Sequence, residues 1–146
     1  DLRILRALQA DASLSNVALA QIVGLSPSPC LRRVRALEAA GVIRGRAAII
    51  DAAAVGLPVS VFLQVTLERQ TEVNLEAFES AVTDAPEVME CYLMTGDADY
   101  LLRVVAPDLD AYHRFLMDRL TSLPGVANIK SSFALRQVKY GYSLPI

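Results

Sequence analysis

Three arginines close together are the most distinctive chemical feature of this sequence. Arg32, Arg33 and Arg35 lie in a segment that reads as a helix. At about 100° per residue, Arg32 lies near the centre of one side of that helix. Its flanks carry Ser28 and Arg35 on one edge and Pro29 and Arg33 on the other. A guanidinium group can bind a phosphate or pair in bidentate fashion with O6 and N7 of guanine, so this side is suited to DNA.

The opposite side of the same helix is apolar. It carries Cys30, Leu31, Val34 and Leu37, which predicts a packed face behind the basic one. A plain helical hairpin with a solvated basic side would show the same pattern, so both interpretations stay open at this point.

Capping and turn residues mark the bounds of the basic helix. Ser26 could cap its start, because a serine hydroxyl can accept a first-turn amide. Pro27 and Pro29 fall within that first turn, where a missing N–H costs little. Gly41 is suited to end the helix in the left-handed conformation. The predicted helix therefore runs from about Ser26 to Gly41.

A shorter helix is predicted just before the basic one. Ser15 could cap it, and Gly24-Leu25 supplies a turn after it. Its predicted inward residues are Val17, Ala20 and Val23. Together the two helices and the turn predict a helix-turn-helix at about residues 16–35.

The charge is unevenly distributed: residues 1–46, called the head below, are basic, and the remainder is acidic. The net charge is −2, but residues 1–46 carry seven basic and three acidic side chains, which gives +4. Residues 47–146 therefore carry −6. Since phosphates repel an acidic surface, DNA contact is expected only at the head.

Two further segments would complete an N-terminal domain of residues 1–50. Residues 1–10 predict a first helix with Leu2, Leu5 and Leu8 inward and Ile4 at the edge. Residues 42–50 predict a short hairpin or strand around Gly45, which would form a wing. Its arginines could reach phosphates, or could be solvated residues on a connecting strand.

The remainder predicts a second domain over residues 58–146, after a hinge at 51–57 that contains Gly56 and precedes Pro58. Alternating apolar residues predict strands at 58–67, 88–95, 99–106 and 126–139. Helices are expected from Asn74 to Thr83, capped by Asn74, and from Asp108 to Leu123. The fold class is therefore α+β, a winged helix-turn-helix followed by a ferredoxin-like βαββαβ domain. Apolar side chains on both sides of the sheet predict a homodimer.

The remaining side chains argue against an enzyme, a metal site or a membrane protein. His113 is interpreted as a packed histidine, and Cys30 and Cys91 as structural thiols. No apolar run approaches the ~20 residues that span a bilayer, and no signal segment is evident, so a cytoplasmic location is expected. Ferredoxin-like domains do occur in enzymes, but one histidine and two distant cysteines offer no catalytic constellation.

Several motifs match one family in order along the chain. They are Asp1-Leu2-Arg3-Ile4-Leu5, Leu25-Ser26-Pro27-Ser28-Pro29-Cys30-Leu31-Arg32-Arg33-Val34, Glu90-Cys91-Tyr92, Gly96-Asp97-Ala98-Asp99-Tyr100-Leu101-Leu102 and Leu123-Pro124-Gly125-Val126. The sequence resembles the Lrp/AsnC (feast/famine) transcriptional regulators. One departure is Ala98, where members commonly carry Phe.

The resemblance implies a C-terminal domain of the RAM type that dimerises, assembles further, often to octamers, and binds a small effector, usually an amino acid. It also implies operator binding by the head, and a dimer would prefer a pseudo-palindromic site. The predicted DNA contacts are Asn16, Ser26, Ser28, Pro29, Arg32, Arg33, Arg35, Arg44 and Arg46.

The effector is expected at the turn from Thr95 to Tyr100. Backbone N–H groups around Gly96 could bind a carboxylate, and Asp97 or Asp99 could bind an ammonium group. The predicted effector contacts are Thr95, Gly96, Asp97, Asp99, Tyr100, Ser131 and Ser132. Two alternatives remain: the turn could be only a hairpin turn, and the protein could be an architectural DNA-binding protein without an effector. No other cofactor is expected.

Overall fold

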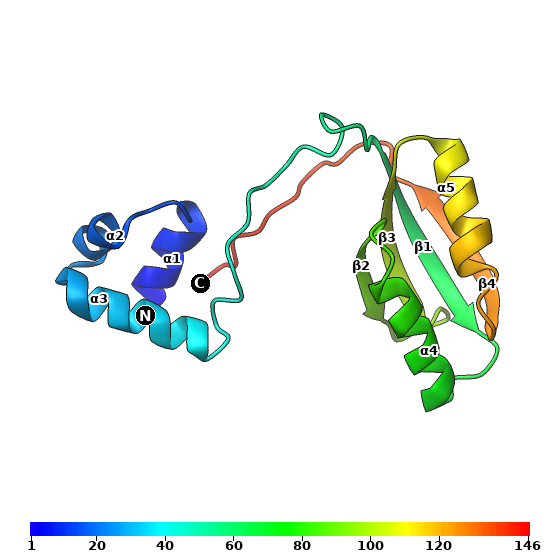
Figure 1. Ribbon diagram of the computed structural model, residues 1–146, viewed down its shortest axis with the longest axis horizontal. Coiled ribbons are helices and arrows are strands. Elements are labelled where there is room, and N and C mark those ends of the chain that lie inside the picture. The colour runs from blue at the N-terminus through cyan, green and yellow to red at the C-terminus, as the bar shows by residue number, and fades with distance from the viewer. The chain divides into compact units, whose positions relative to one another are not determined.

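The computed structural model describes residues 1–146, and the chain divides into two compact units (Figure 1). The N-terminal unit consists of Asp1–Ile49 together with Val138–Ile146, and the C-terminal unit is Ile50–Gln137. The sequence predicts domains at 1–50 and 58–146 joined by a hinge at 51–57, and the two units divide between Ile49 and Ile50. The end of the chain differs from the prediction, because residues 138–146 group with the N-terminal unit instead of with the ferredoxin-like domain.

Three helices form the N-terminal unit: α1 (Leu2–Ala10), α2 (Asn16–Val23) and α3 (Pro27–Ala39). The Ser15 hydroxyl accepts a hydrogen bond from the Ala18 amide at 3.1 Å, which caps α2 as predicted. Gly24 ends α2 with φ 74°, a left-handed backbone that glycine adopts without strain. The helix-turn-helix predicted at about residues 16–35 is therefore present as α2, a short turn and α3.

A single apolar core joins these helices. The buried residues are Ile4, Leu19, Ala20, Val23, Cys30, Val34 and Leu37. In α1, Leu5 and Leu8 pack against this core as predicted, but Leu2 is 54% exposed, and Ile4, predicted at the edge, is fully buried. Val17 is also exposed, contrary to the prediction. Both helices are short and carry apolar residues on several sides, so periodicity alone leaves their orientation ambiguous.

The segment after α3 forms no strand. Gly41 takes φ 73°, as predicted, and the amides of Val42 and Ile43 both donate to the Leu37 carbonyl. The hairpin or strand predicted over residues 42–50 is not formed, since this segment has no ladder partner within the chain.

The C-terminal unit has the predicted element order. Its strands are β1 (Val59–Leu67), β2 (Val88–Leu93), β3 (Tyr100–Ala106) and β4 (Val126–Phe133). Its helices are α4 (Glu72–Thr83) and α5 (Leu109–Phe115), and a π-helical turn, η1 (Leu116–Leu120), continues α5. The sheet order is β2-β3-β1-β4 with every pair antiparallel, which is the ferredoxin-like arrangement.

Both helices cover one face of the sheet (Figure 1). Val61, Leu63 and Val65 of β1 are fully buried against them, and the intervening Phe62 faces the other side and is 40% exposed. The face without helices therefore carries exposed apolar surface, as the alternation of β1 predicts.

Three local details differ from the sequence prediction. The first turn of α4 begins at Glu72 and is capped by Thr71, whereas Asn74 lies inside the helix and donates to the Arg69 carbonyl. His113 is exposed on α5 instead of packed. Strand β4 ends at Phe133 instead of Lys139, and just beyond it the Ala134 amide still donates to the Ser60 carbonyl of β1 at 3.0 Å. None of the helices combines the length and apolar character needed to cross a bilayer.

Candidate DNA-binding and effector-binding sites

The outward side of α3 presents the residues that the sequence selects for DNA. Cys30, Val34 and Leu37 are buried on the opposite side, so the helix is fixed with Arg32 and Arg35 in solvent. Neither arginine makes an ion pair or a hydrogen bond within the chain. Two guanidinium groups are therefore free for an external anion.

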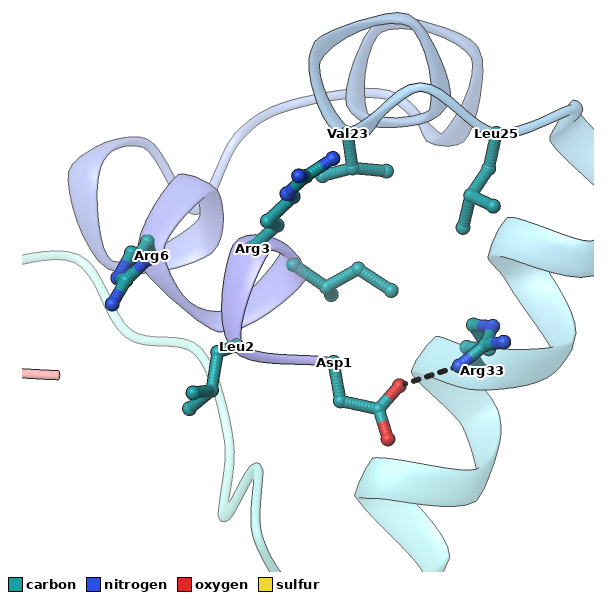
Figure 2. Close-up of a pocket in the computed structure, with 8 residues that line it drawn as sticks. Asp1, Leu2, Arg3, Arg6, Val23, Leu25 and Arg33 are labelled. Atoms are coloured by element: carbon teal, nitrogen blue, oxygen red, sulfur yellow. Dashed lines mark hydrogen bonds and ion pairs between the residues drawn. The ribbon is translucent and has the colours of Figure 1, made fainter.

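Arg33 is differently placed. Its Nη1 lies 3.3 Å from Oδ1 of Asp1, so it turns toward α1 (Figure 2). The two side chains line a hollow of about 480 Å³ whose walls also include Arg3, Arg6 and Leu25. An intramolecular carboxylate partly neutralises Arg33, which makes it a weaker partner for DNA than Arg32. Arg3 and Arg6 were not among the predicted contacts, although their charge was visible in the sequence.

The start of α3 offers fewer amides than a usual helix N-terminus. Pro27 and Pro29 have no N–H, and the Cys30 amide already donates to the Ser26 carbonyl. The Ser26 hydroxyl does not cap the helix, contrary to the prediction, and Ser26 and Ser28 are both exposed. A phosphate here would meet one amide, that of Ser28, and two hydroxyls, and Pro29 would contribute only apolar contact.

Asn16 has a structural position. Its Nδ2 donates to the Pro27 carbonyl at 2.7 Å, which ties the start of α2 to the start of α3. The amide that the sequence assigned to DNA is thus used to hold the helix-turn-helix angle.

The two arginines beyond α3 also differ from each other. Arg46 forms an ion pair with Glu38 at 3.1 Å, whereas Arg44 is exposed and makes no ion pair. Arg44 is therefore the better candidate of the two for a phosphate contact.

A second hollow, of about 190 Å³, lies at the turn between β2 and β3. Its lining consists of Gln64, Met94, Thr95, Asp97, Ala98, Tyr100 and Leu101. Gly96 takes φ 105° within the turn, a backbone region that favours glycine. Three predicted effector residues, Thr95, Asp97 and Tyr100, therefore line one hollow, and Gly96 shapes its rim. Gln64 and Leu101 were missed, although their pairing across β1 and β3 places both on the open face of the sheet.

Asp99 is the clearest departure from the predicted effector site. It is only 5% exposed, and its Oδ2 accepts the Leu67 amide at 2.7 Å. Its Oδ1 accepts from the Gln70 side-chain amide. Both carboxylate oxygens are therefore used inside the fold, so Asp99 fastens the turn to β1 instead of facing a ligand.

Tyr100 lines the hollow but is otherwise a core residue, and the two predicted serines lie apart from the hollow. Tyr100 stacks its buried ring on Phe78 with centroids 4.5 Å apart. Burial, followed by the nearby Glu79 carboxylate, raises the pKa of Tyr100 to about 12. Ser131 shares a hydrogen bond with the Tyr112 hydroxyl beneath the helices. Ser132 pairs with Phe62 and does not line the hollow.

Cys91 and Cys30 are not arranged for chemistry. Burial, followed by the charge of Glu79, raises the pKa of the Cys91 thiol to about 11. Since the thiolate is the reactive form, Cys91 is a poor nucleophile, and Cys30 is fully buried. Both are structural thiols, as the sequence indicates.

Comparison with known proteins assigns a family to both units. Residues 1–44 match the winged helix-turn-helix DNA-binding family, and residues 60–144 match the Lrp/AsnC ligand binding domain. The Bkd operon transcriptional regulator of Pseudomonas aeruginosa is 53% identical over the whole chain and 95% of its own length. The leucine-responsive regulatory protein of Escherichia coli K12 is 41% identical over the whole chain and 89% of its length.

Solved structures agree with the fold. A transcriptional regulator from Neisseria meningitidis, solved with L-methionine, has a TM-score of 0.92 and 41% identity, covering 99% of this chain and 93% of its own. An AsnC family regulator from Agrobacterium tumefaciens has a TM-score of 0.91 and 42% identity, covering 99% of this chain and 94% of its own. With a helix-turn-helix head and a ferredoxin-like body, this chain belongs to the Lrp/AsnC family of DNA-binding transcriptional regulators.

Proposed function

We propose that this regulator reads a pseudo-palindromic operator through Arg32 and its neighbours on α3, and responds to an amino acid at the β2–β3 turn. The observation that supports the DNA assignment is the position of Arg32, at the centre of the outward side and without an intramolecular partner. Arg32 pairs with a guanine in the major groove, where its planar fork matches O6 and N7. Arg35, Arg44, Ser26 and Ser28 contact the flanking backbone.

The Arg32→Ala variant tests this assignment. Loss of a bidentate base contact costs about 1–3 kcal/mol and relaxes specificity at one base-pair position. Fluorescence anisotropy on duplexes selected by the wild-type protein, with each position varied in turn, measures both effects. Loss of affinity spread evenly over all sequences, with a salt slope reduced by about 1, would instead make Arg32 a phosphate contact.

A matched control separates base reading from net charge. Arg114 is exposed on α5 in the C-terminal unit, so Arg114→Ala removes the same charge outside the head. We expect this variant to retain wild-type sequence preference. If both variants behave alike, the effect of Arg32→Ala is general electrostatics.

The effector site is supported by the hollow at the β2–β3 turn and by the L-methionine found in the Neisseria regulator. Asp97 is exposed at its rim and binds the ammonium group, and the amides around Gly96 bind the carboxylate. Met94, Ala98 and Leu101 contact the ligand side chain, which favours an apolar amino acid.

Calorimetry with L-methionine and the other amino acids tests this site. The wild-type chain should release or absorb heat with at least one apolar amino acid, and Asp97→Ala should weaken that binding. Asp84→Ala, which removes an exposed carboxylate at the end of α4, should not. No heat with any amino acid would favour the architectural alternative.

Assembly follows from the open face of the sheet. Phe62 and Tyr92 are 40% and 52% exposed on that face, and a second copy would cover them. A dimer places two α3 helices about 34 Å apart, one turn of DNA, which matches a pseudo-palindrome. Higher assembly, up to an octamer, and a cytoplasmic location complete the proposal.

A further inference from the structure

The last residues of the chain are held against the DNA-binding head by a specific set of contacts. The Gln9 side chain on α1 donates from Nε2 to the Leu144 carbonyl at 3.2 Å. Its Oε1 accepts the Leu144 amide at 2.7 Å, so one side-chain amide pairs with both backbone groups of one residue. Arg6, one α1 turn away, donates from Nε to the Ile146 backbone oxygen at 2.7 Å.

The tail is also shaped locally for this contact. The Ile146 amide donates to the Leu144 carbonyl at 2.9 Å, which closes a three-residue turn around Pro145. The central residue of such a turn has φ of about −75°, and proline restricts φ to about −65°. Pro145 therefore favours this turn even when the tail is not in contact with α1. The contact therefore joins a preset turn to two polar side chains of α1.

Two side chains of the tail contribute little to the contact, since Leu144 is 67% exposed and Val138 is 85% exposed. At Leu144 the tail is therefore held through its backbone, by Gln9. A contact of this kind is specific in geometry but modest in strength, since a typical hydrogen bond contributes about a fivefold factor in an equilibrium constant.

The chain path gives the contact a consequence. The chain leaves the N-terminal unit after Ile49, forms the C-terminal unit, and returns to the N-terminal unit at Val138. The returning segment follows β4, which is hydrogen-bonded to β1 along its length. The head is therefore attached to the C-terminal unit by the covalent linker and again by the docked tail.

We propose that the tail, residues 138–146, is a clasp through which Gln9 and Arg6 anchor the DNA-binding head to strand β4 of the C-terminal unit. With the clasp closed, the head has less orientational freedom, so a dimer loses less entropy when both heads bind one operator. With the clasp open, each head still binds a half-site, but the two heads lose more entropy when both bind one operator. The proposal rests on the proposed function, because it needs two heads on one DNA.

Three variants isolate the clasp. Gln9→Ala removes both side-chain partners of Leu144 and leaves its backbone intact. Leu144→Pro removes the Leu144 N–H. The matched control, Leu144→Ala, keeps the N–H and the carbonyl and deletes only an exposed side chain.

Two measurements on the full chain decide the proposal. The first is amide hydrogen exchange at Leu144 and Ile146, with the amides of α1 as an internal reference. The second is affinity for two duplexes, one with both half-sites selected by the wild-type protein and one with a single half-site. For Gln9→Ala we expect loss of protection at Leu144 and Ile146 but not in α1. Leu144→Pro has no amide at position 144, so for this variant the same loss is read at Ile146. Affinity for the two-half-site duplex should fall about three- to tenfold, with unchanged affinity for the single half-site. Leu144→Ala should match wild type in both.

Each other outcome overturns the proposal. Tail protection unchanged in Gln9→Ala would mean that no clasp exists. Protection lost without a change in two-half-site affinity would mean that the tail contact does not anchor the head. An equal loss on both duplexes would mean that the variants damage the head itself. A wild-type chain that binds neither duplex would instead overturn the proposed function, so the two failures are distinguishable.

Discussion

Replacing Asp99 should weaken the C-terminal unit without removing a ligand contact. The carboxylate accepts the buried Leu67 amide at 2.7 Å and the Gln70 side-chain amide. Asp99→Ala leaves the Leu67 N–H unpaired in a residue that is 6% exposed. A hydrogen bond to a charged acceptor contributes about 1.5–3 kcal/mol. Gln70 is exposed and can turn to water, so most of the loss comes from Leu67. We expect a total loss of about 2–3 kcal/mol.

Asp99→Asn should cost less. The asparagine oxygen can still accept the Leu67 amide, and Gln70 can rotate its own oxygen toward the new NH₂ group. We expect a loss of about 1 kcal/mol or less, because both buried groups keep a partner. The ranking of the two variants is therefore a sharper test than either magnitude alone.

Amide hydrogen exchange of β1 and β3 is the suitable assay, since two units make a single unfolding free energy ill-defined. The amides of α1 and α3 serve as an internal reference and should be unaffected. Asp97→Ala, two residues away and exposed, should leave exchange in β1 and β3 unchanged. The reasoning fails if Asp99→Ala changes exchange no more than Asp97→Ala does. It also fails if Asp99→Ala abolishes L-methionine binding while the sheet keeps its protection.

Two further predictions concern other parts of the chain. Asn16→Ala should destabilise the N-terminal unit by about 1 kcal/mol, measured by exchange in α2 and α3, because the bond to the Pro27 carbonyl is lost. Binding to a single half-site duplex at saturating protein should persist, and a selective loss there would restore Asn16 as a DNA contact. Burial raises the pKa of Cys91 to about 11 and of Tyr100 to about 12, from ordinary values of 9.0 and 10.0. The contribution of these two groups to the stability of the C-terminal unit should be fully present below pH 9.0 and should be lost as the pH rises toward 12. A stability that does not change between about pH 8 and about pH 11 would contradict this.

Strand pairing was the part of the fold most readily predicted from sequence. Apolar residues stand at every odd position of β1, and those from Val61 to Leu67 are buried. The hairpin between β2 and β3 follows from Gly96, whose positive φ the turn requires. The end of β4 could not be predicted, because strand length depends on how far the partner β1 continues beside it. Residues 136–139 satisfy the local pattern of a strand but lie past Val59, the first residue of β1, in this antiparallel register.

The helix-turn-helix was predicted as a motif but not in its side-chain contacts. Capping at Ser15 and the turn at Gly24 are local and were visible in the sequence. The pairing of Arg33 with Asp1 joins residues far apart in the chain, and so does that of Asn16 with Pro27. A helical wheel assigns a residue to one side of its helix, but it does not show which residues of other helices its side chain contacts. Long-range partners therefore give Arg33 and Asn16 contacts within the fold, and their contact with DNA stays a prediction.

The reassignment of Asp99 strengthens the effector site rather than removing it. The Asp99 amide donates to the Val65 carbonyl, and the Met94 amide donates to the Asp99 carbonyl. With its carboxylate on the Leu67 amide and its own amide on the Val65 carbonyl, Asp99 fixes the turn to β1 at two points, and the Met94 amide closes the hairpin itself. A ligand at this turn must therefore act on β1 as well, because the turn cannot shift independently of that strand. β1 is hydrogen-bonded along its length to β4, and β4 leads into the tail that Gln9 holds. The buried Asp99 carboxylate, whose oxygens are both used within the fold, thus joins the proposed effector turn to β1 and, through β1, to β4.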